Sequence, residues 1–432
     1  MNNKKKYYIS EKEKKKIYLE DVELEAFALL AKQRLLSTDQ MYKFISSRTR
    51  LKESSYKSKF FKSFYWKDLV FPLRVLTGQI GKKNFYRIGS KGVELLIREG
   101  YLDKHFINLQ IDKFSNLKNI DHFIATQDII VNAFDSSFRE DIKLECINDV
   151  KDLELKQSFN GDIANLKPDT SLKINNHYIH VEMDMGTEQL SIINEKAKKY
   201  IELCKNNPKE QHSIVFSVID NSFEEGLATY TEKPERRIRN MKEAMLSLDG
   251  LHHFNLSIYV TPFARTHDLV FKMLKGEKPY KEDIVMNNIE TVAEIFSYAN
   301  ESFGYIFEPI DLEDVFPNDT PLYYIPDKCY KVNNKAGTAE HYVMFLFLEE
   351  GSVQHLDRLR YLHHIMGKTK VPIRKIIVLY HDSDELSNDI VGQFKFVLFG
   401  DGLSLSETTE ENPTFLRSTS PFRMGETSYE GV

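Results

Sequence analysis

Cysteine and long hydrophobic runs are both scarce in this chain of 432 residues. Its three cysteines, Cys146, Cys204 and Cys329, lie far apart and form neither a CxxC pair nor a Cys/His zinc pattern. This spacing indicates reduced thiols and predicts a cytoplasmic protein. No apolar run approaches the roughly 18 residues that a membrane helix needs, and no apolar segment follows the lysine-rich N-terminus. The sequence therefore predicts no membrane partner.

Phosphate-binding loops are also missing from the sequence. The glycines near residues 78–82 and 367–369 lack the spacing of a loop that cradles phosphate. His177 and His180 fall on opposite faces of a predicted strand, which makes them a poor metal pair. These absences exclude the most common nucleotide-binding and histidine-ligated signatures.

Charge is distributed very unevenly along the chain. The formal net charge is −5, yet residues 1–100 carry 23 Lys/Arg against 11 Asp/Glu. Within residues 43–91 the count is 13 basic residues against two acidic ones, Glu53 and Asp68. Basic charge concentrated in one small region predicts contact with a polyanion, most simply the phosphates of double-stranded DNA. A merely solvated surface would not exclude acidic residues so thoroughly.

The basic region has the element order of a winged helix-turn-helix. Apolar spacing and turn residues predict three helices, a hairpin and a closing helix, over residues 19–34, 40–45, 52–66, 69–88 and 90–99. The third helix would enter a DNA groove and the hairpin tip would contact phosphate. The residues expected to bind DNA are Lys52, Lys57, Lys59, Lys62, Lys82 and Lys83. The same fold also serves protein–protein contacts, although the charge favours DNA.

A second pattern occupies residues 167–200. Pro168-Asp169 precedes a predicted strand over residues 177–185, in which Glu182 and Asp184 share one face because strand side chains alternate. Gly186-Thr187 ends the strand and a helix is expected over residues 188–204. Three carboxylates so placed supply the oxygen ligands that Mg²⁺ or Mn²⁺ prefers. The plainer alternative is a half-buried strand whose polar face is simply wet.

The spacing PD-x12-ExD, followed by Lys196-x3-Tyr200 on the next helix, resembles the PD-(D/E)XK nuclease superfamily. The resemblance implies a small α/β sheet domain in which Asp169 and Glu182 bind the metal. Asp184 replaces the usual lysine, and Lys196 on the helix takes that part in some members. If the protein nicks DNA, it is expected to use carboxylate-bound metal, with Asp169, Glu182, Asp184 and Lys196 as catalytic residues.

The wider layout resembles the replication-relaxation family of plasmids and mobile elements. A basic winged helix comes first and a PD…ExDxGTE…K…Y block follows, over roughly residues 18–262. This resemblance implies a role in plasmid replication or conjugative mobilisation, with other replication or mobilisation proteins as further partners. It implies either a Mg²⁺-dependent nickase or a non-catalytic DNA-binding initiator or regulator that keeps a nuclease-like scaffold.

The second half of the chain repeats part of the first. PDKCYKVNN at residues 326–334 matches PDTSLKINN at residues 168–176, and HYV at 341–343 matches HYI at 177–179. Agreement at this many spaced positions indicates an internal duplication of the α/β domain. Glu182 then falls opposite Leu346 or Phe347, so the second copy is expected to have lost its metal site.

Together these patterns predict an α/β (α+β) protein with six segments. They are a basic disordered tail (1–17), a winged helix-turn-helix domain (18–115), a PD-(D/E)XK-like domain (118–262), a helical linker (263–305), a degenerate second nuclease-like domain (306–402) and a flexible tail (403–432).

Overall fold

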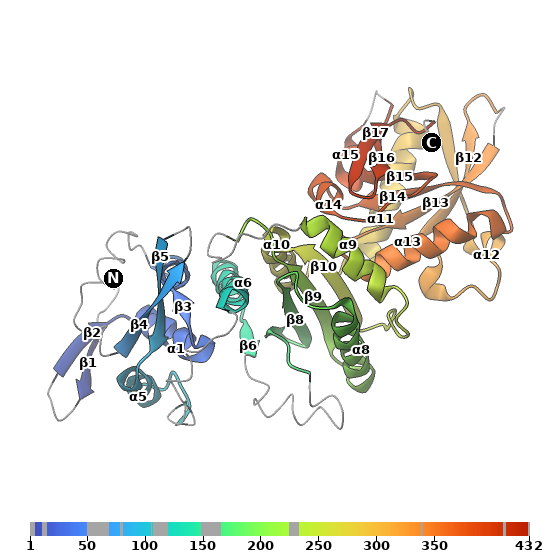
Figure 1. The fold of residues 1–432 in the computed structure, drawn as a ribbon. Coiled ribbons are helices and arrows are strands. Elements are labelled where there is room, and N and C mark those ends of the chain that lie inside the picture. Colours follow the sequence, from blue (N-terminus) through green and yellow to red (C-terminus); the bar gives the residue numbers. More distant parts are fainter. Residues whose placement is uncertain are drawn as a thin grey trace.

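The computed structural model (Figure 1) shows a mixed α/β protein built around two larger mixed sheets. It describes residues 5–10, 15–49, 69–77, 81–104, 106, 120–147, 166–223, 233–337, 340–408 and 412–430. Within these residues, no helix is both long enough and apolar enough to cross a membrane.

The N-terminal unit combines short helices with a small antiparallel sheet. Its helices are α1 (Asp21–Gln33), α2 (Thr38–Ser46) and α5 (Ser90–Arg98). Its three-stranded sheet has the order β3–β5–β4, formed by Leu36–Ser37, Gly81–Ile88 and Val70–Thr77. The Ser37 side chain accepts a hydrogen bond from the backbone N–H of Gln40, and the Gln40 side chain accepts one from the backbone N–H of Ser37. This capping box fixes the start of α2.

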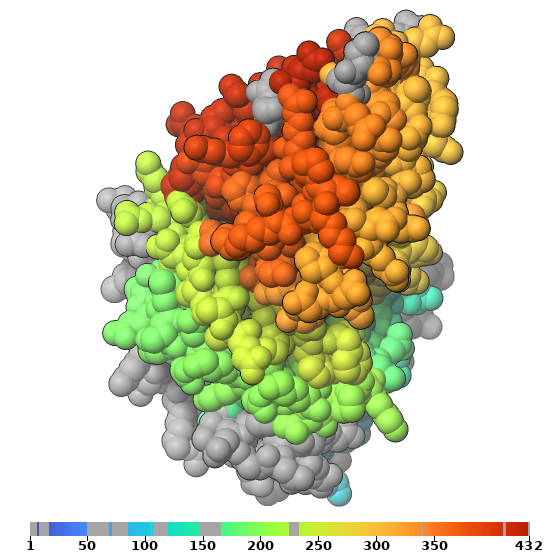
Figure 2. Space-filling view, turned by 90° about the vertical axis from the view of Figure 1, so that its right-hand side faces the viewer, coloured from blue at the N-terminus to red at the C-terminus, as the bar shows by residue number. Residues whose placement is uncertain are grey.

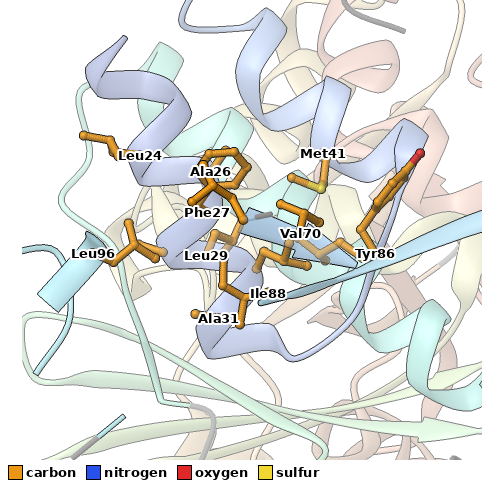
Figure 3. Close-up of a cluster of buried hydrophobic side chains, with 14 of the residues drawn as sticks. Leu24, Ala26, Phe27, Leu29, Ala31, Met41, Val70, Tyr86, Ile88 and Leu96 are labelled. Atoms are coloured by element: carbon orange, nitrogen blue, oxygen red, sulfur yellow. The ribbon is translucent and has the colours of Figure 1, made fainter. Parts of the chain in front are cut away.

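Figure 3 shows the apolar core that joins these elements. Leu24 and Phe27 of α1 pack with Met41 of α2, Ile88 of β5 and Leu96 of α5, all of them buried. Each large apolar side chain that is fully buried stabilises the fold by about 1.5–3 kcal/mol. The third helix expected over residues 52–66 lies outside the described residues.

The prediction of a disordered tail over residues 1–17 is wrong for the part of this segment that the structure describes. β1 (Lys5–Ser10) and β2 (Lys15–Leu19) form an antiparallel pair. Tyr7 and Ile17 are buried against the N-terminal core, so the hairpin removes apolar surface from water. The prediction of disorder followed the high lysine content of this segment and overlooked its short alternation of apolar residues.

Helix α6 (Ile120–Arg139) lies between the N-terminal unit and the first large sheet (Figure 1). Ile130 and Val131 pack into the N-terminal core, whereas Ile124 and Ile129 pack against the sheet. Gln40 of α2 also donates a hydrogen bond to the backbone carbonyl of Ile124. One helix is therefore shared by two cores and links them.

The first large sheet has five strands in the order β10–β9–β8–β7–β6. The strands are Leu256–Pro262, Gln211–Val218, His177–Asp184, Thr170–Ile174 and Glu145–Ile147. β8, β9 and β10 run parallel, while β6 and β7 are antiparallel. Helices α6 and α10 (Phe263–Leu274) cover one face, and α8 (Leu190–Asn206) and α9 (Pro234–Met245) cover the other.

The second large sheet repeats this order and adds two strands. Its order is β11–β12–β13–β14–β15–β16–β17, formed by Tyr305–Ile310, Lys328–Asn334, Glu340–Phe347, Ile373–Tyr380, Val397–Asp401, Phe415–Ser420 and Arg423–Thr427. The first three strands are antiparallel, and β13, β14 and β15 are parallel, as in the first sheet.

Helices cover both faces of the second sheet as well. Its covering helices are α11 (Glu282–Glu294) with the π-helical turn Ile295–Ala299, α12 (Leu312–Val315), α13 (Val353–Ile365), α14 (Ser383–Asn388) and α15 (Gly402–Glu407). Short 3-10 turns lie at Leu322–Tyr324 and Met366–Lys368. In the region expected to be a helical linker, α10 packs on the first sheet and α11 on the second.

The flexible tail expected over residues 403–432 is also wrong in its described part. β16 and β17 extend the second sheet, and Phe415 and Tyr429 are buried in its core. The polar composition of this segment concealed the few apolar residues that anchor it.

A tight contact joins the edge of the first sheet to the second. The backbone N–H of Val260 in β10 donates to the carbonyl of Gly351, at 2.9 Å. The Tyr259 hydroxyl donates to Glu349 Oε2 at 2.6 Å, and Arg265 bonds to Glu350 at 2.8 Å. In Figure 2 the yellow-green segment that contains α9 lies between the green segment that contains α8 and the orange-to-red C-terminal half.

Replacing Gly351 by Ala is expected to destabilise this junction. Gly351 has φ +81°, and an added Cβ would lie 2.6 Å from Thr261 Cγ2 and 3.1 Å from the Val260 carbonyl oxygen. Left-handed strain and this clash together should lower the free energy of unfolding by about 2–4 kcal/mol, measured by urea denaturation.

Gly304→Ala is the matched control for this change. Gly304 has φ +75°, but no described atom would lie within 4 Å of its added Cβ. Only the strain of about 1–2 kcal/mol should appear there. Equal losses in the two variants would contradict a close contact between the sheets.

Candidate functional site

Strand β8 supplies the centre of the candidate site. Ile179, Val181 and Met183 point into the core under α6, while His180 and Glu182 point toward α8. Glu182 is only 2% exposed, so α8 covers the polar face rather than leaving it wet. The strand alternation expected from the sequence is present, and a buried carboxylate is its consequence.

Two donors from α8 hold Glu182. The Lys196 ammonium donates to Glu182 Oε2 at 3.0 Å, and the Tyr200 hydroxyl donates to Oε1 at 2.6 Å. Lys196 also donates to Glu188 Oε2 at 3.1 Å. Lys196 and Tyr200 are four residues apart, so one face of the helix presents both groups to the strand.

Asp169 lies beside this group, immediately before β7. Its Oδ2 accepts a hydrogen bond from the backbone N–H of Met183 at 2.8 Å, and His122 Nε2 of α6 lies 3.2 Å from the same oxygen. Burial alone would lower the pKa of His122, but the hydrogen bond and charge of Asp169 outweigh it and raise that pKa. Asp169 therefore interacts with two ionisable neighbours, His122 and Glu182.

The electrostatics of Glu182 reflect this crowding. Burial, reinforced by the negative charge of Asp169, raises the pKa of Glu182 to about 7 despite the opposing effect of Lys196 and the Tyr200 hydrogen bond. For Lys196, burial acts to lower the pKa, but the carboxylates of Glu182 and Glu188 raise it above its usual value. In this cluster the charged form of the Glu182 carboxylate is therefore disfavoured, whereas the charged form of the Lys196 ammonium is strongly favoured.

Asp184 does not join this cluster. The Arg237 guanidinium of α9 donates to Asp184 Oδ2 at 2.8 Å and to Oδ1 at 3.0 Å, and both side chains are largely buried. Arg237 also donates to the backbone carbonyl of Glu188. Within the described part of the chain, no three His, Cys, Asp or Glu side chains are arranged to hold a metal ion. The sequence-predicted trio of Asp169, Glu182 and Asp184 therefore does not converge in this structure.

The second sheet shows what replaces the cluster. Asp327 Oδ2 accepts a hydrogen bond from the backbone N–H of Phe347 at 2.7 Å, as Asp169 does from Met183. The strand registers Thr170↔Val181 and Lys328↔Phe345 then align Glu182 with Leu346. Leu346 is fully buried, and Arg358 of α13 pairs with Asp327 at 2.9 Å. This position therefore has no carboxylate for a metal.

The sequence analysis did not assign a role to three residues of the site, namely Tyr200, Glu188 and His122. Tyr200 and Glu188 stand within the quoted motif, so the K-x3-Y and GTE signals could have indicated them. His122 lies 47 residues before Asp169 and is brought there by the packing of α6, which no local pattern announced. Of the expected DNA-binding lysines, Lys82 and Lys83 lie in β5, and the other four lie outside the described residues.

Comparison with known proteins bears on the same region. Residues 27–219 match the sequence model of the replication-relaxation family. The expected family resemblance is confirmed over this part of the chain. The matched region runs from α1 to the end of β9 and includes Asp169, Glu182 and Lys196. No curated protein and no solved structure matches the chain.

Glu182→Gln is expected to flatten the pH dependence of folding stability. Glutamate has an ordinary pKa of 4.5, and its folded-state pKa here is about 7. Between these values the folded protein binds more protons than the unfolded chain, so this contribution to stability is lost as the pH rises through 7. Relative to wild type, the variant should gain about 1–3 kcal/mol between pH 5 and pH 8, measured by urea denaturation in EDTA.

Glu195→Gln provides a control on the same helix. The Glu195 side chain is 63% exposed and pairs with Lys198, so its removal should leave the pH dependence near that of wild type. Parallel stability curves for Glu182→Gln and wild type would refute the elevated pKa.

Proposed function

We propose that this protein binds DNA during replication or mobilisation of a plasmid or other mobile element, and nicks it at a site formed by Asp169, Glu182 and Lys196. The match to the replication-relaxation family supports the biological setting. The observation that carries the chemistry is the proximity of two acidic side chains and one lysine: Asp169 just before β7, Glu182 on β8 and Lys196 on α8.

A divalent cation suits Asp169 and Glu182. Mg²⁺ is commonly bound by one or two carboxylates together with substrate phosphates and water, so two protein ligands suffice. The charge of Asp169 helps to raise the pKa of Glu182, and a bound divalent cation would offset that repulsion. Asp184 is left out of the proposed ligand set because Arg237 already binds both of its oxygens. Mn²⁺ accepts the same oxygen ligands.

The remaining residues have separable roles in this proposal. A bound Mg²⁺ would supply a nucleophilic water and stabilise charge on the phosphodiester. Lys196 stays protonated near neutral pH and would contact the scissile phosphate. The Tyr200 hydroxyl orients Glu182, and the Met183 N–H orients Asp169.

Within this proposal the N-terminal unit is a winged helix that delivers duplex DNA, and the first large sheet is a PD-(D/E)XK-like domain. The basic charge of residues 43–91 supports the first assignment. The order of antiparallel and parallel strands around β8 supports the second. The second sheet, with Leu346 in place of Glu182, serves as a structural or docking module.

A non-catalytic role is the second candidate, and one observation favours it. Both oxygens of Glu182 already accept hydrogen bonds, from Lys196 and Tyr200, so the buried cluster is satisfied without metal. In that case the protein would be a DNA-binding initiator or regulator. The two candidates differ in whether DNA is cut.

Duplex binding is expected to depend on the N-terminal lysines. Replacing Lys57, Lys59 and Lys62 together by Ala should weaken binding to all duplex sequences and reduce the salt dependence of log K by about 2.7, or 0.9 for each phosphate contact. Electrophoretic mobility shift assays between low and physiological salt would measure both effects. Wild-type affinity in the triple variant would remove these lysines from the DNA interface.

Nicking is expected to require the two carboxylates. Wild-type protein should convert a supercoiled plasmid that carries the DNA flanking its own gene to open circles with Mg²⁺ or Mn²⁺, and not with EDTA. Asp169→Asn and Glu182→Gln each keep the side-chain size but remove a charge that the cation needs, so nicking should fall by roughly 100-fold or more. Duplex affinity should change little in either variant.

The control for this assay is Glu195→Gln, which removes an exposed carboxylate next to Lys196 in the chain. It should nick like wild type. Failure of wild-type protein to nick with either metal would favour the non-catalytic candidate.

A further inference from the structure

A groove separates helix α9 from the turn between β16 and β17. Its volume is about 1010 Å³. The groove is lined by residues 233–243, in and just before α9, and by residues 420–423, at the turn between β16 and β17. The residues that carry its charge and aromatic surface are Lys233, Arg236, Arg239, Arg423 and Phe422.

Positive charge dominates this groove. Lys233, Arg236 and Arg423 are exposed, and the two acidic residues of the lining are Glu235 and Glu243. Glu243 is itself paired with Arg239 and with Arg360. The groove therefore presents cationic groups suited to an extended anion such as a phosphate backbone.

An aromatic ring lies among these cations. Phe422 is 47% exposed, and the Arg239 guanidinium is 5.8 Å from the centre of its ring. An exposed ring beside guanidinium groups is the combination on which unpaired bases stack. Bases within a duplex are already stacked on each other and do not offer their faces in this way.

The groove adjoins a second hollow that reaches Arg237. This second hollow, of about 430 Å³, is lined by Lys233, Arg236, Arg237 and Asn240. Arg237 bonds to Asp184 and to the backbone carbonyl of Glu188. The Glu188 carboxylate in turn pairs with Lys196, which holds Glu182.

We propose that single-stranded DNA binds in this groove, with its phosphates on Arg236 and Arg423 and one base stacked on Phe422. The strand would run along α9 toward Arg237 and the Glu182–Lys196 pair. This inference rests on the proposed function, because it assigns the unpaired strand of a DNA substrate to the same site. The duplex is assigned to the N-terminal lysines, so the two surfaces hold different forms of DNA.

The test is fluorescence anisotropy of full-length protein with a labelled oligothymidine of about 20 nucleotides, titrated at several salt concentrations. Arg236→Gln combined with Arg423→Gln should weaken binding and reduce the slope of log K against log salt by about 1.4, or 0.7 for each phosphate contact in a single strand. Phe422→Ala should weaken binding roughly tenfold with the salt slope unchanged, and Phe422→Tyr should restore it.

Exposed residues elsewhere provide matched controls. Arg98→Gln in α5 and Tyr298→Ala, whose side chain is 75% exposed, should bind the oligonucleotide like wild type. Thermal denaturation of every variant would verify that these surface changes leave the fold intact. The Lys57/Lys59/Lys62 triple variant should lose duplex affinity and keep affinity for the single strand.

The outcomes separate this inference from the proposed function. The groove assignment is overturned if wild type does not bind the oligonucleotide, or if the groove variants bind as wild type does. Nicking and duplex binding could persist in either case, and the proposed function would stand. Conversely, groove-dependent binding by a protein that never nicks would support the groove and count against catalysis.

Discussion

The charge of a buried carboxylate, Glu182, is the constraint on which the candidate site depends. A carboxylate that is 2% exposed has lost its hydration, and burial together with the charge of Asp169 raises its pKa to about 7. Lys196 and Tyr200 replace the lost water with two hydrogen bonds. Because both donors come from α8, the position of this helix over β8 and the charge state of Glu182 depend on each other.

The second sheet shows that the fold does not need this carboxylate. Its strands follow the same order and directions, yet a fully buried Leu346 stands where the first sheet has Glu182. Replacing buried ionic groups by apolar ones is often neutral or stabilising, so packing alone would favour leucine in both places. A buried glutamate with an elevated pKa is therefore better explained by a use for the site than by stability.

The sequence predicted much of the sheet that carries the site and less of what surrounds it. Strand alternation placed Glu182 and Asp184 on one face of β8, and the PDxxxK[I/V]NN repeat anticipated a second sheet with the same strand order. The partners of those carboxylates were not foreseen, because Arg237 is 53 residues from Asp184 and His122 comes from α6. The terminal hairpins were missed since Tyr7 and Phe415 find their apolar contacts only in the tertiary structure. Composition therefore predicted disorder wrongly for the described parts of both terminal segments.

Asp184 lies outside the Glu182 cluster, but its ion pair with Arg237 still connects it to that cluster. The PD-(D/E)XK pattern that the sequence resembles has a lysine at this position. Here an aspartate binds Arg237, and that arginine also bonds to the backbone of Glu188, whose carboxylate pairs with Lys196. The positive charges beside these carboxylates come from Lys196 of α8 and Arg237 of α9. Because residues of α9 also line the basic groove, the Asp184–Arg237 pair links the helix beside the groove to the strand that carries Glu182.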